Sequence, residues 1–187
     1  ETLTIDVSVH QRVIHDDSFG MTGMIAGQGL KDYLACISGK MELGVWVEKA
    51  LGQIKQLREL EPNNEYYALV QAHIYLRGRR DEEARWILEN GSFHKFVIGR
   101  KAEINAYYLY LTALLKKDGT TQMRALDEIN RLYIKHPYSW ALLCMLVNLE
   151  PKYRDYSDRI RVLERQFFNG SNQILLYAEA YTCFQER

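Results

Sequence analysis

Apolar and polar side chains follow two different spacings along this chain. Over residues 2–14 they alternate, with Leu3 and Ile5 on one face, which predicts a half-buried strand within an N-terminal β segment of residues 1–18. Residues 19–29 are rich in glycine and predict a flexible joint. From residue 30 to residue 187, apolar side chains recur every three or four positions, which predicts an all-α domain.

The predicted strand needs a partner, because a single strand leaves the hydrogen-bonding groups of both its edges unpaired. We therefore expect residues 1–18 to end a β domain that lies upstream, or to fold back as a short hairpin. The chain also begins without methionine, which favours an internal piece of a longer, multidomain protein.

Glycine, proline and asparagine divide the α domain into nine predicted helices. Their approximate ranges are 30–39, 43–60, 65–77, 81–90, 102–117, 121–135, 138–149, 156–168 and 172–185. A shift of 41 positions superimposes several residues of this domain on later ones. The pairs are Tyr66 and Tyr107, Tyr67 and Tyr108, Ala72 and Ala113, Gly78 and Gly119, and Ala84 and Ala125. We interpret each copy as helix, turn, helix, with glycine ending the first helix in a left-handed conformation and alanine where two helices approach closely.

This pattern resembles the tetratricopeptide repeat (TPR), a helix–turn–helix unit of about 34 residues. The most similar stretch runs from Glu48 to Asn64, and Ala72, Tyr75 and Ala84 then fall at the small, aromatic and small positions of the next repeat. The resemblance covers residues 43–137 well and residues 138–185 loosely. It departs from the family in lacking the usual tryptophan, in its long offset and in an extra linker over residues 93–101. It implies a right-handed superhelix of antiparallel helical hairpins, an α-solenoid.

In TPR-like arrays the first helix of each hairpin lines a concave groove, and two matched helices here carry one continuous face. Tyrosine and arginine on such a face are favoured anchors for a bound protein. The candidate groove residues are Tyr66, Leu69, His73, Arg77, Tyr107, Tyr110 and Lys117. The alternative, which the sequence leaves open, is that these side chains pack between hairpins.

Composition narrows the possible partners. The chain has 24 lysines and arginines against 24 aspartates and glutamates, so we expect neither general nucleic-acid binding nor attraction to anionic membranes. Its apolar runs fall short of about 18 residues, so we expect no membrane insertion. Three scattered cysteines fit neither a disulfide framework nor a zinc site. The ends do not identify the compartment, although we favour the cytoplasm.

Few residues carry catalytic or ligand chemistry. The densest metal-type group lies near the joint and consists of His10, His15, Asp16 and Asp17. We interpret it mainly as a turn at the end of the strand. The glycines of the joint match neither phosphate-binding motif. The basic run Arg77–Arg80 precedes three acids, so we expect it to cap helices.

No catalytic signature occurs, so we predict a protein without enzymatic activity and without a cofactor. The predicted role is a protein-interaction or scaffold module of a larger protein, which binds a peptide or a domain in its concave groove. That partner could be another domain of the same parent chain. The alternative is a purely structural spacer, and a less favoured one is a metal or ligand site at the strand–glycine–helix junction.

Overall fold

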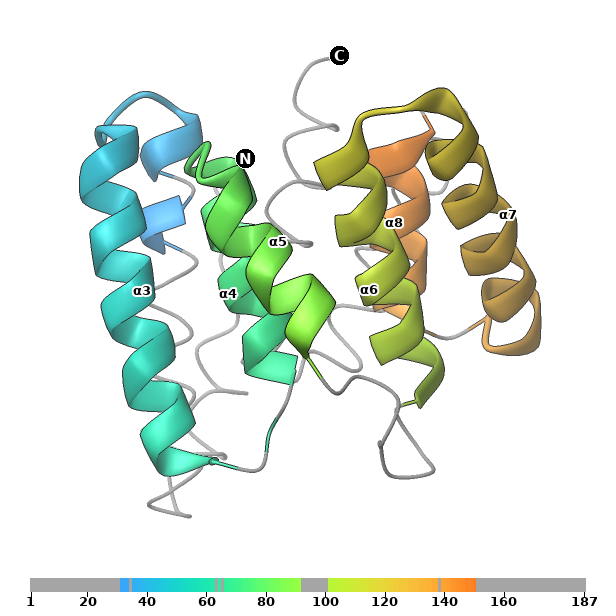
Figure 1. Ribbon diagram of the computed structural model, residues 1–187, viewed down its shortest axis with the longest axis horizontal. Helices are drawn as coiled ribbons and strands as arrows, with labels where there is room; N and C mark the ends of the chain where they lie inside the picture. The colour runs from blue at the N-terminus through green and yellow to red at the C-terminus, as the bar shows by residue number, and fades with distance from the viewer. Residues whose placement is uncertain are drawn as a thin grey trace, which may run out of the picture.

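The computed structural model describes residues 31–33, 35–62, 64, 66–91, 101–137 and 139–150, with the side chains of residues 101, 102 and 140 left out. Within this part the chain is helical and contains no strand (Figure 1). The predicted strand, the glycine joint and the helices predicted over 156–168 and 172–185 lie outside the described residues.

Six long helices carry the labels of Figure 1. They are α3 (Leu43–Leu60), α4 (Tyr66–Arg77), α5 (Asp81–Asn90), α6 (Lys101–Lys116), α7 (Gly119–Lys135) and α8 (Trp140–Leu149). The predicted bounds of α3 and α5 are confirmed, and the other four helices begin within two residues of the prediction. The starts of α7 and α8 are set by capping side chains, since Asp118 and Ser139 each accept a hydrogen bond from a backbone N–H of the first turn.

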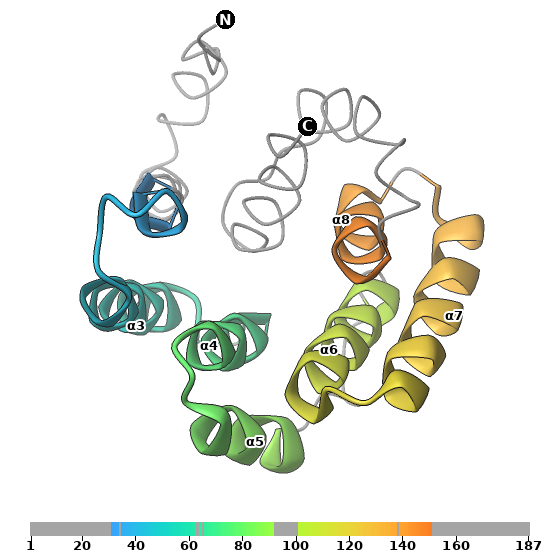
Figure 2. The ribbon, with the colours of Figure 1, turned by 90° about the horizontal axis from the view of Figure 1, so that it is seen from above.

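The six helices lie in two rows along an arc. Figure 2 shows α3, α5 and α7 on its outer side and α4, α6 and α8 on its inner side. Each helix packs against the next along the chain, and the inner helices α4 and α6, and α6 and α8, also pack against each other. Each inner helix therefore contacts both rows, which explains why its side chains are buried on more than one face.

Small side chains lie where paired helices meet. The alanines of the internal repeat are all buried, with at most 4% exposure: Ala72, Ala84, Ala113 and Ala125. They belong to α4 and α5 in one pair and to α6 and α7 in the other, and the helices of each pair pack together. A methyl group at these positions fills the interface without holding the two backbones apart.

The segment before α3 is anchored to it by one ring contact and one buried carboxylate. The rings of Tyr33 and Trp46 lie 4.6 Å apart between centroids, tilted by 32°. Asp32, only 5% exposed, accepts hydrogen bonds from Lys49 Nζ at 3.2 Å and Gln53 Nε2 at 3.1 Å. A buried carboxylate needs such donors, so these contacts fix the segment against α3.

The turns between paired helices correct one prediction. Gly78 and Gly119 do not take the left-handed conformation; Arg79 (φ 60°) and Lys117 (φ 54°) take it instead. After α4, Arg79 N–H donates to the carbonyl of Leu76 and Arg80 N–H donates to that of Tyr75, which is the Schellman arrangement with arginine in the left-handed position. Gly119 is the first residue of α7.

Glycine occupies position 78 for a different physical reason, which is the lack of space for a side chain. A Cβ at this position would lie 2.7 Å from Val47 Cγ2 and 3.2 Å from the carbonyl oxygen of Ile74. The glycine therefore allows the end of α4 to approach α3 closely, rather than supplying an unusual backbone angle. From the sequence alone, a glycine near a turn could serve either a left-handed backbone angle or a close approach of two helices, and the two look the same.

We expect Gly78→Ala to lower the free energy of unfolding by about 1–3 kcal/mol, because the methyl group overpacks the contact with Val47. Gly52→Ala is the matched control, since a Cβ there meets nothing within 4 Å in the middle of α3. That control should raise stability by about 0.5–1 kcal/mol through helix propensity. Urea unfolding followed by circular dichroism measures both, and two shifts in the same direction would contradict the close approach.

The contribution of Asp118 to the stability of the first turn of α7 depends on pH. Its two carboxylate oxygens accept hydrogen bonds from Thr121 Oγ1 and from Thr121 N–H, both at 2.7 Å. These bonds, the side-chain one first, hold the pKa of the Asp118 carboxyl below its usual value. A carboxyl with a lowered pKa stabilises the fold above the pKa it has when unfolded, and that contribution disappears as the pH falls through the folded pKa.

Asp118→Asn keeps a capping oxygen but removes the charge. We expect the wild type to be more stable than this variant at neutral pH, and the difference to close during acid titration. Urea unfolding of both proteins at a series of acidic pH values tests this. A difference that stays constant from neutral to strongly acidic pH would show that the charge of Asp118 contributes nothing.

Candidate functional site

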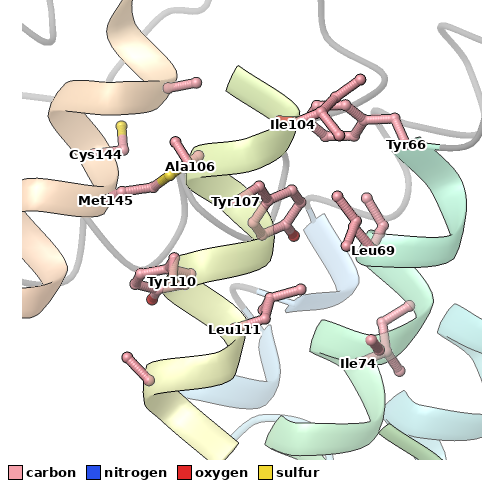
Figure 3. Packing of buried hydrophobic residues seen from close by; sticks show 14 of the residues in the cluster. Tyr66, Leu69, Ile74, Ile104, Ala106, Tyr107, Tyr110, Leu111, Cys144 and Met145 are labelled. Carbon is pink, nitrogen blue, oxygen red and sulfur yellow. The ribbon is translucent and has the colours of Figure 1, made fainter. Parts of the chain in front are cut away.

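Aromatic side chains fill the contact between α4 and α6. In Figure 3, Tyr107 of α6 projects toward Leu69 of α4, and on the other side Met145 of α8 reaches toward Ala106. The ring centroids of Tyr66 and Tyr107 lie 5.2 Å apart. The imidazole of His73 meets the rings of Tyr107 and Tyr110 edge-on, each at 5.7 Å between centroids. Such offset and edge-to-face pairs are the favourable arrangements for aromatic rings.

Two hydrogen-bonded pairs of side chains join α4 and α6 across this contact. His73 is fully buried, and its Nδ1 lies 2.8 Å from Tyr107 Oη. Arg77, one turn further along α4, donates from Nη2 to Tyr110 Oη at 3.4 Å. Buried polar groups are costly unless bonded, so these bonds favour the observed register between α4 and α6.

The seven residues predicted to line a groove fall into two groups. Five are at most 2% exposed: Tyr66, Leu69, His73, Tyr107 and Tyr110. Arg77 is half-buried, and Lys117 is exposed in the turn before α7, where its Nζ lies 3.0 Å from Asp81 Oδ2. The five buried side chains pack between helices, as the alternative interpretation of this face described. A partner could reach Arg77 and Lys117 but not those five without uncovering them.

Part of the basic run at the end of α4 is held within the chain. The guanidinium of Arg80 lies 2.7 Å from Glu83 and 3.6 Å from Glu48, and 4.7 Å above the ring of Tyr75. The hydrogen bond to Glu83 raises the pKa of Arg80 and lowers that of Glu83. Arg80 therefore joins the turn to α5 and α3, in agreement with the structural role expected for this run.

Large apolar side chains on the outer row are exposed to solvent, and they are not among the residues predicted from the sequence to form a site. Trp86 of α5 is 67% exposed, and Met123 and Ile134 of α7 are 65% and 70% exposed. The signal was present in the helical spacing of α5. The buried residues of that helix are Ala84, Ile87 and Leu88, and Trp86 does not share their face.

A hollow of about 810 Å³ runs along α7. It is lined by Leu109, Gly119, Thr120, Met123, Arg124, Asp127, Glu128 and Arg131. Its lining contains two arginines and two acids, so its formal charges balance. An open, mixed surface of this kind suits contact with a protein better than enclosure of a small molecule.

Metal chemistry receives no support from the described residues, among which no group of three histidines, cysteines or acids could hold an ion. The candidate metal group near the joint, His10 to Asp17, lies outside the described residues. Among the described helices, none is both long enough and apolar enough to cross a membrane.

Comparison with known families gives a match over almost the whole chain. A model for the N-terminal part of a family of unknown function, DUF5717, matches residues 2–187. The chain belongs to the DUF5717 family. No curated protein and no solved structure matches it. Membership of DUF5717 assigns no activity to the chain.

Proposed function

We propose that this chain is a non-enzymatic protein-interaction or scaffold module, built as a TPR-like superhelix of antiparallel hairpins. Two features support that architecture. The described helices alternate between an outer and an inner row, and each inner helix packs against its chain neighbours and the next inner helix. This is the contact pattern of stacked hairpins that bury a shared core. The match to an N-terminal family region supports a role within a larger protein.

The observation that carries the interaction role is the exposure of Trp86, Met123 and Ile134 on the outer helices. When a partner removes apolar side chains of this size from water, the free energy of the complex falls. Tryptophan is also among the residues that most often dominate binding energy in protein interfaces. The partner would be a protein or a peptide, and another domain of the parent chain is included in that class.

In this proposal the partner binds a different surface from the expected concave groove. Because five of the seven candidate groove residues are buried, we propose that a partner contacts the outer row, together with Arg77 and Lys117 at the turns. The tyrosines of the inner row then act by holding α4 and α6 in register. Substituting them would test folding more than binding.

Affinity capture from lysate of the source organism tests the proposal. One bait is the whole chain, and the other carries Trp86→Ala, Met123→Ala and Ile134→Ala, with helix content checked by circular dichroism. We expect a protein that the first bait retains and the folded second bait loses. If neither bait retains a protein, or both retain the same set, these outer side chains are not an interaction surface.

A structural spacer is the second candidate, and one observation favours it. The buried bond between His73 and Tyr107 and the partly buried bond between Arg77 and Tyr110 hold the inner helices α4 and α6 together. A rigid array separates flanking regions by a constant distance. If the chain is a spacer, we expect both baits to be well folded and to retain no protein.

A further inference from the structure

We propose that the outer face of α5 around Trp86 docks a segment of a partner protein that presents lysine or arginine side chains. This inference rests on the proposed interaction role and names the chemistry of the partner. The residues that surround Trp86 on the helix indicate that chemistry. Residues three and four positions away are the surface neighbours of any helical side chain. For Trp86 they are Glu82, Glu83, Glu89 and Asn90.

Three of these four neighbours are acids, and they are accessible. The side chain of Glu82 is 80% exposed and that of Glu83 is 43% exposed, while Glu89 also lies in solvent. Over its whole length α5 carries four acids, Asp81, Glu82, Glu83 and Glu89, against the single arginine Arg85. Four acids and one arginine give the helix itself a formal charge of −3, in a chain whose formal net charge is zero.

Ion pairs within the chain hold three of these four acids, and the first of them joins Asp81 Oδ2 to Lys117 Nζ at 3.0 Å. Arg85 lies 2.7 Å from Glu82, and Arg80 lies 2.7 Å from Glu83. Within the described part of the chain, Glu89 has no ion pair. Exposed pairs of this kind are weak, so a cation from a partner can compete for the same carboxylates.

An indole ring and nearby carboxylates select the same kind of ligand. The face of tryptophan attracts a lysine or arginine cation, and does so more strongly than tyrosine or phenylalanine. Carboxylates at the rim of the ring add Coulomb attraction and raise the association rate. The hollow along α7 offers no such preference, because Arg124 and Arg131 balance Asp127 and Glu128 there. Charge complementarity therefore points to the face of α5.

Two fluorescein-labelled peptides test the inference by fluorescence anisotropy with the full chain. In one, lysine alternates with leucine; in the other, glutamate replaces every lysine. We expect binding of the lysine peptide alone. Trp86→Ala should weaken it by at least about tenfold, the effect of losing a moderate hot spot. The double variant Glu82→Gln, Glu89→Gln should weaken it and flatten its dependence on salt.

Met123→Ala is the matched control, since Met123 is as exposed as Trp86 but lies on α7, and we expect it to leave binding within about twofold of wild type. Equal binding of both peptides, no binding of the lysine peptide, or an unchanged affinity of Trp86→Ala would each overturn the inference. So would a dimer of the chain alone, seen by sedimentation, that Trp86→Ala abolishes. If capture from lysate depends on Met123 and Ile134 but not on Trp86, the interaction role stands and this inference fails.

Discussion

Replacing Trp46 by alanine is expected to lower the free energy of unfolding by about 3–5 kcal/mol. Trp46 is 1% exposed and stacks on Tyr33, so the substitution leaves a cavity where α3 meets the segment before it. The surrounding helices can close such a cavity only in part, because interiors are packed at crystal-like density. Urea unfolding followed by circular dichroism at 222 nm measures the loss.

Trp86→Ala is the matched control for this result. The same chemical change on a side chain that is 67% exposed should alter stability by less than about 0.5 kcal/mol. Equal losses for the two variants would mean that Trp46 is not in the core. The comparison also establishes that Trp86→Ala folds normally, which the peptide experiment requires.

Tyr107→Ala is also expected to lower the free energy of unfolding by about 3–5 kcal/mol, as the truncation of buried aromatic side chains generally does. Its ring is fully buried and contacts the rings of Tyr66, His73 and Tyr110. Tyr107→Phe isolates the hydroxyl that lies 2.8 Å from His73 Nδ1. Losing one partner of that buried bond should cost about 1–3 kcal/mol.

Tyr75→Phe provides the control for the hydroxyl. Tyr75 is only partly buried, and its Oη accepts a long hydrogen bond of 3.4 Å from Gln71. We expect little change in the urea midpoint of this variant. If Tyr107→Phe unfolds at the same midpoint as Tyr75→Phe, the bond between His73 and Tyr107 does not stabilise the contact of α4 with α6.

Helix positions could be predicted from the sequence because each helix has an apolar stripe bounded by clear breaks. In α3 the buried residues Trp46, Ala50, Ile54 and Leu57 recur at spacings of three and four, and Glu61-Pro62 ends the pattern. The same regularity gave the bounds of α5. At α7 the pattern alone places the start late, because Asp118 and Gly119 are polar or small and join the helix through capping.

The burial of the inner-row tyrosines could not be predicted in the same way. Tyr66 and His73 have the spacing of one face of α4, and Tyr107 and Tyr110 have that of one face of α6. Such spacing is identical for a face that binds a partner and one that packs on the next helix. Which of the two occurs depends on how closely α4 and α6 approach. That approach is a tertiary contact between residues such as His73 and Tyr107, which are 34 positions apart.

The turns show a related limit. Glycine near the end of a helix favours a left-handed conformation on average, yet Arg79 and Lys117 adopt it here. The position of Gly78 is decided by Val47, a residue of another helix. Trp86 is the opposite case, because the spacing within its own helix, which sets it off the face of Ala84, Ile87 and Leu88, is enough to predict an exposed position.

The contacts between the described helices have a mechanical consequence. The extensive ones join helices that are adjacent in the chain or two places apart. Such short sequence separations favour rapid folding, since each contact closes only a short loop. They also mean that tension along the chain is carried through one interface after another. Pulled from its two ends, this part of the protein should lengthen stepwise as successive helices detach, which would allow it to act as a compliant connection under load.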